Sequence, residues 1–202
     1  MKKIIPFFLL VLFLTTGCKQ IAMWKYGIKT PKTETPESIL AYAKKQGQNT
    51  DNIYMFKDSA SYTKFLKDSL YKKAFLSAIV FNDKGLLMNY KDSTSCQWSA
   101  VAYIKKLKTD TIYRIDESRK FLSVIPFLIP LNAQATQTMN AAGYDYTVIF
   151  TWAKYIGKLN ERLFCINEAA KNNTNVKIRV ISLNVDVQKS WDLQKSGKMK
   201  MN

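Results

Sequence analysis

Residues 146–185 constrain the fold more than any other part of the chain. The apolar runs 146–151 and 176–185 each predict a strand. Between them, residues 158–171 carry apolar side chains three or four positions apart, which is typical of a helix with one face against a sheet. Parallel strands require a crossover of this kind, so we predict two parallel strands joined by a helix and an α/β fold.

Residues 35–107 predict a second α/β region. Thr35 as N-cap and Pro36 at the first helical position start a helix that Gly47 ends. The turn residues 82–85 lie between two apolar runs and predict a hairpin. The remaining predicted elements are a strand at 53–56, a helix at 59–70, hairpin strands at 75–81 and 86–90, and a helix at 97–107.

Residues 108–143 predict a connector between these two regions. A short strand is expected at 111–115 and a helix at 116–125, while 134–142 fits either a helix or a loop. The apolar run 121–130 contains Pro126 and Pro130, which favours a buried connector over a membrane segment. In region 144–194 a short helix is expected around Trp191, and a basic tail follows at 195–202.

The first residues predict export and a lipid anchor. Lys2 and Lys3 precede an apolar block at 4–14 that is too short to span a bilayer, so 1–17 reads as a signal peptide. The small residues before Cys18 resemble the bacterial lipobox, which implies lipidation of Cys18. A plain secreted protein and a retained N-terminal anchor are the alternatives. Residues 18–34 then form a tether.

The residues after Cys18 indicate a destination. Lys19 follows the anchor where the inner-membrane retention signal would have Asp, which by resemblance favours the outer membrane. The first acid is Glu34, so an acidic surface-export tether is missing. We therefore expect a cell-envelope protein that faces the periplasm, with the lipid bilayer as its partner through Cys18.

The charge balance is strongly basic. Lys and Arg number 31 against 15 Asp and Glu, and removing Lys2 and Lys3 from the formal +16 leaves +14. This balance suits an anionic membrane surface or an acidic protein. The lysines are spread along the chain, however, which is how an ordinary solvated surface looks. Nucleic acid is not an expected partner of an anchored, exported chain.

Several classes of chemistry lack their residues. The chain has no histidine, which removes the commonest general base and metal ligand. None of its seven glycines stands in a nucleotide-binding spacing. We therefore predict no metal and no cofactor. With Cys18 lipidated, only Cys96 and Cys165 remain, and no C-x-x-C exists.

The stretch 150–164, FTWAKYIGKLNERLF, carries a resemblance to a known family. Trp152, Ala153, Tyr155 and Gly157, followed by the helix, the strand ending at Asp186 and then Trp191, resemble the first half of bacterial extracytoplasmic thioredoxin-like domains. The resemblance covers about a quarter of the chain. It implies a thioredoxin-like mixed sheet flanked by helices.

Both catalytic positions depart from that family. Ile156 stands where the family has its nucleophilic cysteine, and Leu159 stands where it has the resolving one. In the enzymes a helix N-terminus lowers the pKa of the first thiol, and isoleucine removes the reaction. Thiol–disulfide exchange by the family mechanism is excluded here, and we assign no catalytic residue. The degenerate motif comprises Trp152, Ala153, Tyr155, Ile156, Gly157, Lys158 and Leu159.

The second half of the family pattern has a counterpart earlier in the chain. The hairpin 75–90 and the helix 97–107 resemble the family's closing hairpin and helix, although the proline that enters the family hairpin is absent before Phe75. We therefore expect a thioredoxin-like domain in permuted order, or two incomplete units that complete one another. Either arrangement places Ile79 and Val148 in one sheet.

The remaining polar residues offer one candidate thiol. Cys96 precedes a helix start, which can lower its pKa, although an inert cysteine is the alternative. A Cys96–Cys165 disulfide needs Cα atoms within ~7 Å, which the predicted layout disfavours. The acids receive surface or capping roles: Glu161, Glu168, Asp145 and Asp186.

These observations predict a membrane-anchored lipoprotein with a redox-inactive domain that acts as a binding or structural module. The surface at 152–158 would meet an envelope protein, with Tyr155 as the first choice for an exposed aromatic and Trp152 as a core residue. The alternative is a single-cysteine thiol redox enzyme that uses Cys96, and a third reading is a purely structural envelope protein.

Overall fold

A computed structural model describes residues 20, 23–68, 77–89, 97–109, 111–132 and 143–191. The helices are α2 (Pro36–Lys45), α3 (Ser59–Lys67), α5 (Gln97–Lys105) and α6 (Leu159–Lys171). Three short 3-10 turns are η1 (Phe121–Ser123), η2 (Ile125–Phe127) and η3 (Lys154–Ile156). The strands are β1 (Ile53–Phe56), β2 (Ala78–Asn82), β3 (Leu86–Met88), β4 (Ile115–Lys120), β5 (Leu128–Pro130), β6 (Tyr146–Trp152) and β7 (Ile178–Asn184).

The strands form one mixed sheet in the order β4-β3-β2-β6-β7-β1-β5. β6 pairs in parallel with β7, and β7 pairs in parallel with β1, as the crossover pattern predicts. β2, β3, β4 and β5 pair antiparallel with their neighbours. The α/β prediction is therefore confirmed as a seven-stranded mixed sheet with helices.

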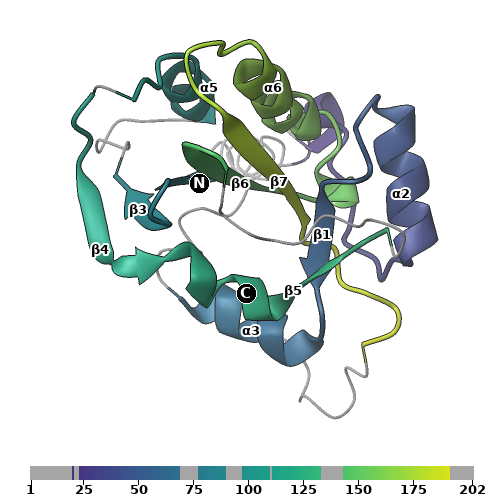
Figure 1. The fold of residues 1–202 in the computed structure, drawn as a ribbon. Coiled ribbons are helices and arrows are strands. Elements are labelled where there is room, and N and C mark those ends of the chain that lie inside the picture. The colour runs from purple at the N-terminus through teal and green to yellow at the C-terminus, as the bar shows by residue number, and fades with distance from the viewer. Residues whose placement is uncertain are drawn as a thin grey trace, which may run out of the picture.

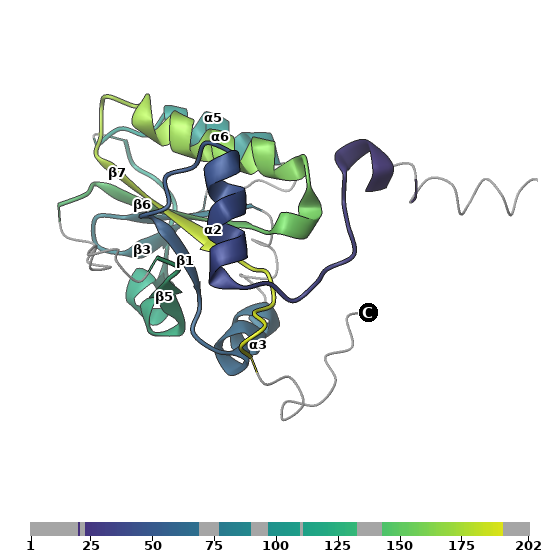
Figure 2. The ribbon, with the colours of Figure 1, turned by 90° about the vertical axis from the view of Figure 1, so that its right-hand side faces the viewer.

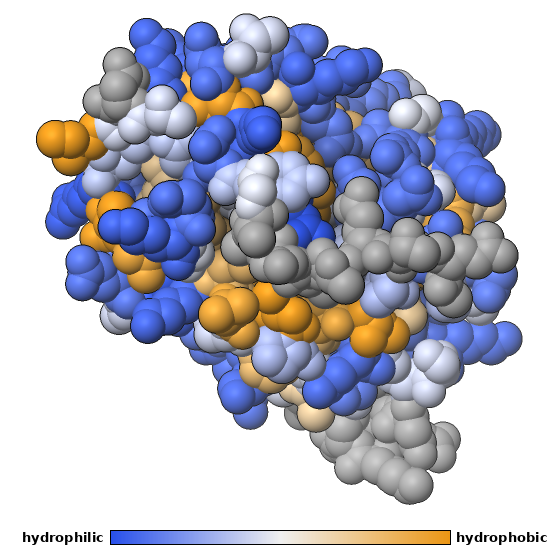
Figure 3. Space-filling view, viewed as in Figure 1, coloured by the Kyte–Doolittle hydropathy of each residue, from blue (hydrophilic) through white to orange (hydrophobic). Residues whose placement is uncertain are grey.

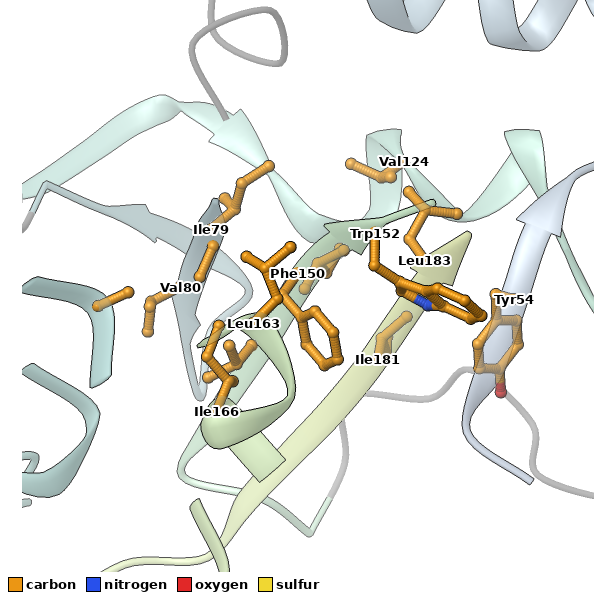
Figure 4. Close-up of a cluster of buried hydrophobic side chains, with 14 of the residues drawn as sticks. Tyr54, Ile79, Val80, Val124, Phe150, Trp152, Leu163, Ile166, Ile181 and Leu183 are labelled. Carbon is orange, nitrogen blue, oxygen red and sulfur yellow. The ribbon is translucent and has the colours of Figure 1, made fainter. Parts of the chain in front are cut away.

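Helices lie on both faces of this sheet (Figures 1 and 2). α5 and α6 lie side by side on one face, and α3 lies on the other. α2 stands at the β1 side, where Asn167 of α6 donates a hydrogen bond to Gln48 (2.7 Å). All seven residues of β6 are buried, which explains why this strand reads as a continuous apolar run. Figure 4 shows Phe150 of β6 beside Leu163 and Ile166 of α6, with Trp152 farther along the strand.

Local signals in the sequence set the ends of several elements as expected. The Thr35 side chain accepts a hydrogen bond from the Ser38 amide, and Ser38 returns one, which forms a capping box at the start of α2. In the β2–β3 hairpin Asn82 Oδ1 accepts from the Leu86 amide (2.8 Å), and Gly85 takes a positive φ of 71°. The hairpin and the helix over 97–105 are confirmed.

The two halves that the sequence separates lie next to each other. Ile79 of β2 pairs with Ile149 of β6, and Val80 pairs with Val148. The expectation that Ile79 and Val148 share a sheet is therefore confirmed, on adjacent strands.

Residues 111–125 were predicted wrongly. The segment expected to be a helix holds the edge strand β4 and the turn η1, and 111–114 hold no strand. β4 is mostly exposed, so it has no apolar alternation to reveal it, and its pairing with the distant β3 fixes it. Phe121 then turns into the core against Phe81 (ring centroids 5.6 Å apart).

The outer parts of the chain complete this description. Residues 108–143, predicted as a connector, supply both edge strands, β4 and β5, and their part 133–142 lies outside the described residues. Trp191 lies in a bend and its ring packs against Tyr62 (5.3 Å), and the residues after it lie outside the description.

Among the described helices none is long and apolar enough to cross a membrane. The face in Figure 3 is mostly hydrophilic, with apolar side chains in small groups.

Candidate functional site

The candidate site is the joint between β6 and α6, which contains the degenerate motif. β6 ends at Trp152, η3 makes one tight turn, and α6 begins at Leu159. Gly157 between them has φ 57° and ψ −127°, a conformation that residues with a side chain rarely adopt. We call residues 153–158 the β6–α6 loop.

The apolar members of the motif belong to the core. Trp152 is fully buried, where it stacks on Tyr42 (6.0 Å) and meets Phe164 edge-on (5.4 Å). Ala153 is also fully buried, and Ile156 is 2% exposed. Core packing was the favoured role of Trp152, and the structure places it there.

Tyr155 does not have the exposure that we expected. Its side chain is half-buried, and burial first, then the neighbouring Tyr62 and Asp186, raise the pKa of its hydroxyl. Leu159 and Gly157 are also half-buried, and Lys158 is exposed. The Tyr155 side chain packs against the hydrophobic core, which accounts for its partial burial.

Residues 23–34, predicted as a tether, lie against the loop, and we call them the N-terminal strap. The Lys158 amide donates to the Tyr26 carbonyl (2.8 Å), and the Lys29 amide donates to the Tyr155 carbonyl (2.7 Å). A side chain at Gly157 would overlap the carbonyl oxygens of Tyr26 and Gly27. Figure 2 shows this strap in purple beside the start of α6.

The far end of the strap is fixed at Glu34. Its amide donates to the Val187 carbonyl (2.8 Å), and its carbonyl accepts from the Lys189 amide (2.8 Å). Its carboxylate accepts from Lys154 Nζ (2.6 Å) and Ser38 Oγ (2.7 Å). Burial raises the pKa of Glu34, but the hydrogen bonds from Lys154 and Ser38 outweigh it and lower that pKa.

A buried carboxyl group, Asp186, lies beneath the loop. It is 2% exposed, and its Oδ2 accepts from the Lys154 amide (2.8 Å) and from Asn184 Nδ2 (2.8 Å). Burial raises the pKa of Asp186 despite these hydrogen bonds. Burial first, and then the charge of Asp186, raises the pKa of Tyr62 to about 12. The capping role predicted for Asp186 is confirmed, because its carboxyl group accepts from the first amide of η3. The alternative prediction, a surface role for Asp186, is wrong because the residue is buried.

Further polar atoms are buried around the joint. Asn160 donates to the Ala153 carbonyl (2.8 Å) and to the Tyr42 hydroxyl (3.0 Å), which ties α6 and α2 to the loop. Sequence reasoning missed Asn160, and a polar residue in the first turn of an amphipathic helix gives little sign of burial. Within the described residues three buried atoms around the joint lack a hydrogen-bond partner: Trp152 Nε1, Asn160 Oδ1 and Gln188 Oε1.

The thiols lie away from this joint or outside the description. Cys165 is free and exposed on α6, and its Sγ lies 3.3 Å from the Glu161 carbonyl oxygen. Cys18 and Cys96 lie outside the described residues. Among the residues that the structure describes, no cluster of three or more His, Cys, Asp or Glu is placed to hold a metal ion.

Comparison with family models, with curated proteins and with solved structures finds no match to this chain. The main-chain donor at 158 and the main-chain acceptor at 155 are both hydrogen-bonded to the N-terminal strap, beside the exposed Lys158 side chain and the half-buried Tyr155 ring. The loop can therefore hold a polypeptide segment through main-chain hydrogen bonds, as it holds the strap.

Asp186→Asn tests the buried carboxyl group. The amide oxygen can accept both hydrogen bonds, while the variant avoids the cost of burying a charge. Because the pKa of Asp186 is raised, its favourable contribution is complete below about pH 3.8 and is lost as pH rises through its folded-state pKa. As the pH rises through this pKa, we expect the wild type to lose stability that the variant keeps. The free energy of unfolding of Asp186→Asn should therefore increase relative to that of the wild type.

Urea unfolding of both proteins from pH 4 to pH 8 measures this difference. Asp145→Asn is the matched control, since that carboxylate also accepts from a backbone amide (Lys177, 2.7 Å) but belongs to a residue that is only half-buried. A difference between Asp186→Asn and wild type that stays constant with pH would contradict the expectation.

Proposed function

We propose that this chain is an envelope lipoprotein, anchored through Cys18, whose thioredoxin-like domain has lost its redox centre and serves as a binding or structural module. One observation carries the proposal. Ile156, at the family's nucleophile position, is 2% exposed and packs in the core, so the joint serves the fold without a thiol.

The arrangement of the two halves supports a thioredoxin-like domain in permuted order. The hairpin β2–β3 pairs with β6, the strand that enters the joint, and its helix α5 lies beside α6. Asn173, just after α6, donates to the carbonyls of Ile104 and Leu107 at the end of α5 (2.8 and 3.1 Å). The two helices therefore run in the same direction, and both begin at the edge of the sheet where the loop lies.

Restoring the missing thiols tests the family geometry. A disulfide needs Cβ atoms about 3.5–4.5 Å apart, and a joint with the family geometry would bring positions 156 and 159 that close. We expect Ile156→Cys with Leu159→Cys to form a disulfide between positions 156 and 159, found by peptide mapping without reductant. Ile156→Cys with Glu161→Cys is the matched control and should remain reduced. Equal results in both variants would count against a thioredoxin-like joint.

A binding role would use the surface around Tyr155 and Lys158. In a pull-down from envelope extract, Tyr155→Ala with Lys158→Glu should lose partners that the wild type retains. Tyr144→Ala with Lys177→Glu makes the same changes at exposed positions near the opposite ends of β6 and β7 and should retain them. Identical partner lists for the wild type and both variants would favour a purely structural role.

A Cys18→Ser chain tests the anchor in the same preparation. It is expected in the soluble fraction.

A single-cysteine thiol enzyme is the second candidate, and the direction of α5 favours it. Gln97, the first residue of α5, lies at the same edge of the sheet as Leu159, and Cys96 precedes it in the sequence. A helix start lowers the pKa of a nearby thiol.

Alkylation separates the two candidates. The lipoprotein module predicts that a mild alkylating reagent labels Cys96 no faster than the exposed Cys165, and that Cys96→Ser keeps every phenotype. Labelling of Cys96 at least tenfold faster than Cys165, with loss of phenotype in Cys96→Ser, would establish the thiol enzyme instead.

A further inference from the structure

The N-terminal strap covers the candidate site with few buried atoms of its own. No residue from 23 to 34 is buried, and 29–33 are exposed. Among the described residues its attachments include the two main-chain hydrogen bonds at Tyr155 and Lys158, the bridge at Glu34, the ion pair from Glu34 to Lys154, and the contact of Arg162 with the Tyr26 ring. Segments held by few buried apolar contacts open at much lower free energy than the core.

We infer that the strap is a reversible cover, and that the β6–α6 loop beneath it is a binding site for a peptide that carries a carboxylate. The strap is the resident occupant of this site. The loop recognises it through main-chain atoms, the Lys158 amide and the Tyr155 carbonyl, and through Lys154, which pairs with the carboxylate of Glu34.

The close approach of the strap explains the glycine at position 157. The Tyr26 and Gly27 carbonyls occupy the space where a Cβ of residue 157 would lie, so the strap requires glycine there independently of the positive φ. Arg162 lies over the Tyr26 ring, 5.7 Å from its centroid, and adds a second cationic contact. Release of the strap would leave the main-chain atoms of the loop and the Lys154 ammonium to an outside ligand.

The strap also links the site to the membrane anchor, a step that rests on the proposed function. With the strap in place, residues 19–22 alone separate Cys18 from the domain, a reach of at most roughly 18 Å. With the strap released, residues 19–34 separate them, a reach of up to roughly 60 Å. Release of the strap would therefore open the site and, at the same time, let the domain move farther from the membrane.

Two proline variants test the cover in the full mature chain. Lys29→Pro removes the amide that donates to Tyr155, whereas Lys32→Pro makes the same change at an amide without a hydrogen bond in the described structure. We expect amide hydrogen exchange at Lys158 to rise at least tenfold in Lys29→Pro and to stay unchanged in Lys32→Pro. Exchange within β6 reports whether either variant has unfolded.

A peptide of residues 20–35, labelled with a fluorophore, tests the ligand class. It should bind Lys29→Pro at least tenfold more tightly than wild type or Lys32→Pro, and a Glu34→Gln version of the peptide should bind more weakly. Equal exchange at Lys158 in both proline variants would overturn the cover. Raised exchange without peptide binding, or binding that ignores Glu34→Gln, would overturn the acidic-peptide site.

Gly157→Ala provides a second variant in case Lys29→Pro does not fold. It displaces the strap from the loop side, and Gly47→Ala is its control, because Gly47 also has a positive φ (68°) but open space around it. Raised exchange at Lys158 is expected only in Gly157→Ala, and its absence would overturn the cover. Neither readout requires an envelope partner, so failure of the pull-down and failure of the strap are distinguishable.

Discussion

The pairing of β6 on both sides is the interaction on which the rest of the structure depends. β7 pairs with it in parallel over its full length, and β2 pairs with it antiparallel, so two regions far apart in sequence share one strand. Phe150 and Trp152 on this strand meet Phe164 of α6, which fixes the helix over the sheet. The direction in which the chain leaves β6 is thereby set, and with it the position of the β6–α6 loop.

The joint at the end of β6 combines apolar core residues with buried polar groups. Ile156 and Trp152 fill space as core residues, while Asp186 satisfies the Lys154 amide that the tight turn η3 leaves without a helical partner. A short turn directly after a buried strand exposes such amides to the core, and a buried acceptor costs less than leaving them unpaired. The raised pKa of Asp186 reflects that compromise between burial and capping.

Sequence patterns predicted those elements whose burial repeats along the chain. β6 is a continuous apolar run, α6 has regular apolar spacing, and the β2–β3 hairpin has a turn that Asn82 and Gly85 specify, so the sequence predicts all of these elements. β4 is an exposed edge strand held by main-chain pairing, and such pairing has no signature in side chains. The same reason hid the strap, whose contacts with Tyr155 and Lys158 are main-chain hydrogen bonds. The exposure predicted for Tyr155 is wrong because its side chain packs against the core.

The strap has the energetics of a cover because its contacts are individually weak. Each main-chain hydrogen bond contributes a net ~0.5–1.5 kcal/mol, and ordering the exposed residues 29–33 opposes closure through lost conformational entropy. The Glu34–Lys154 ion pair is partly shielded from solvent, and it joins the strap to the β6–α6 loop. The main-chain amide of the same Lys154 donates a hydrogen bond to Asp186. Closing the strap therefore places the Glu34 carboxylate beside the Lys154 ammonium, close to the buried carboxyl group of Asp186. An outside peptide that supplied its own carboxylate would satisfy Lys154 equally well, so competition with such a ligand follows from the same contacts that hold the strap.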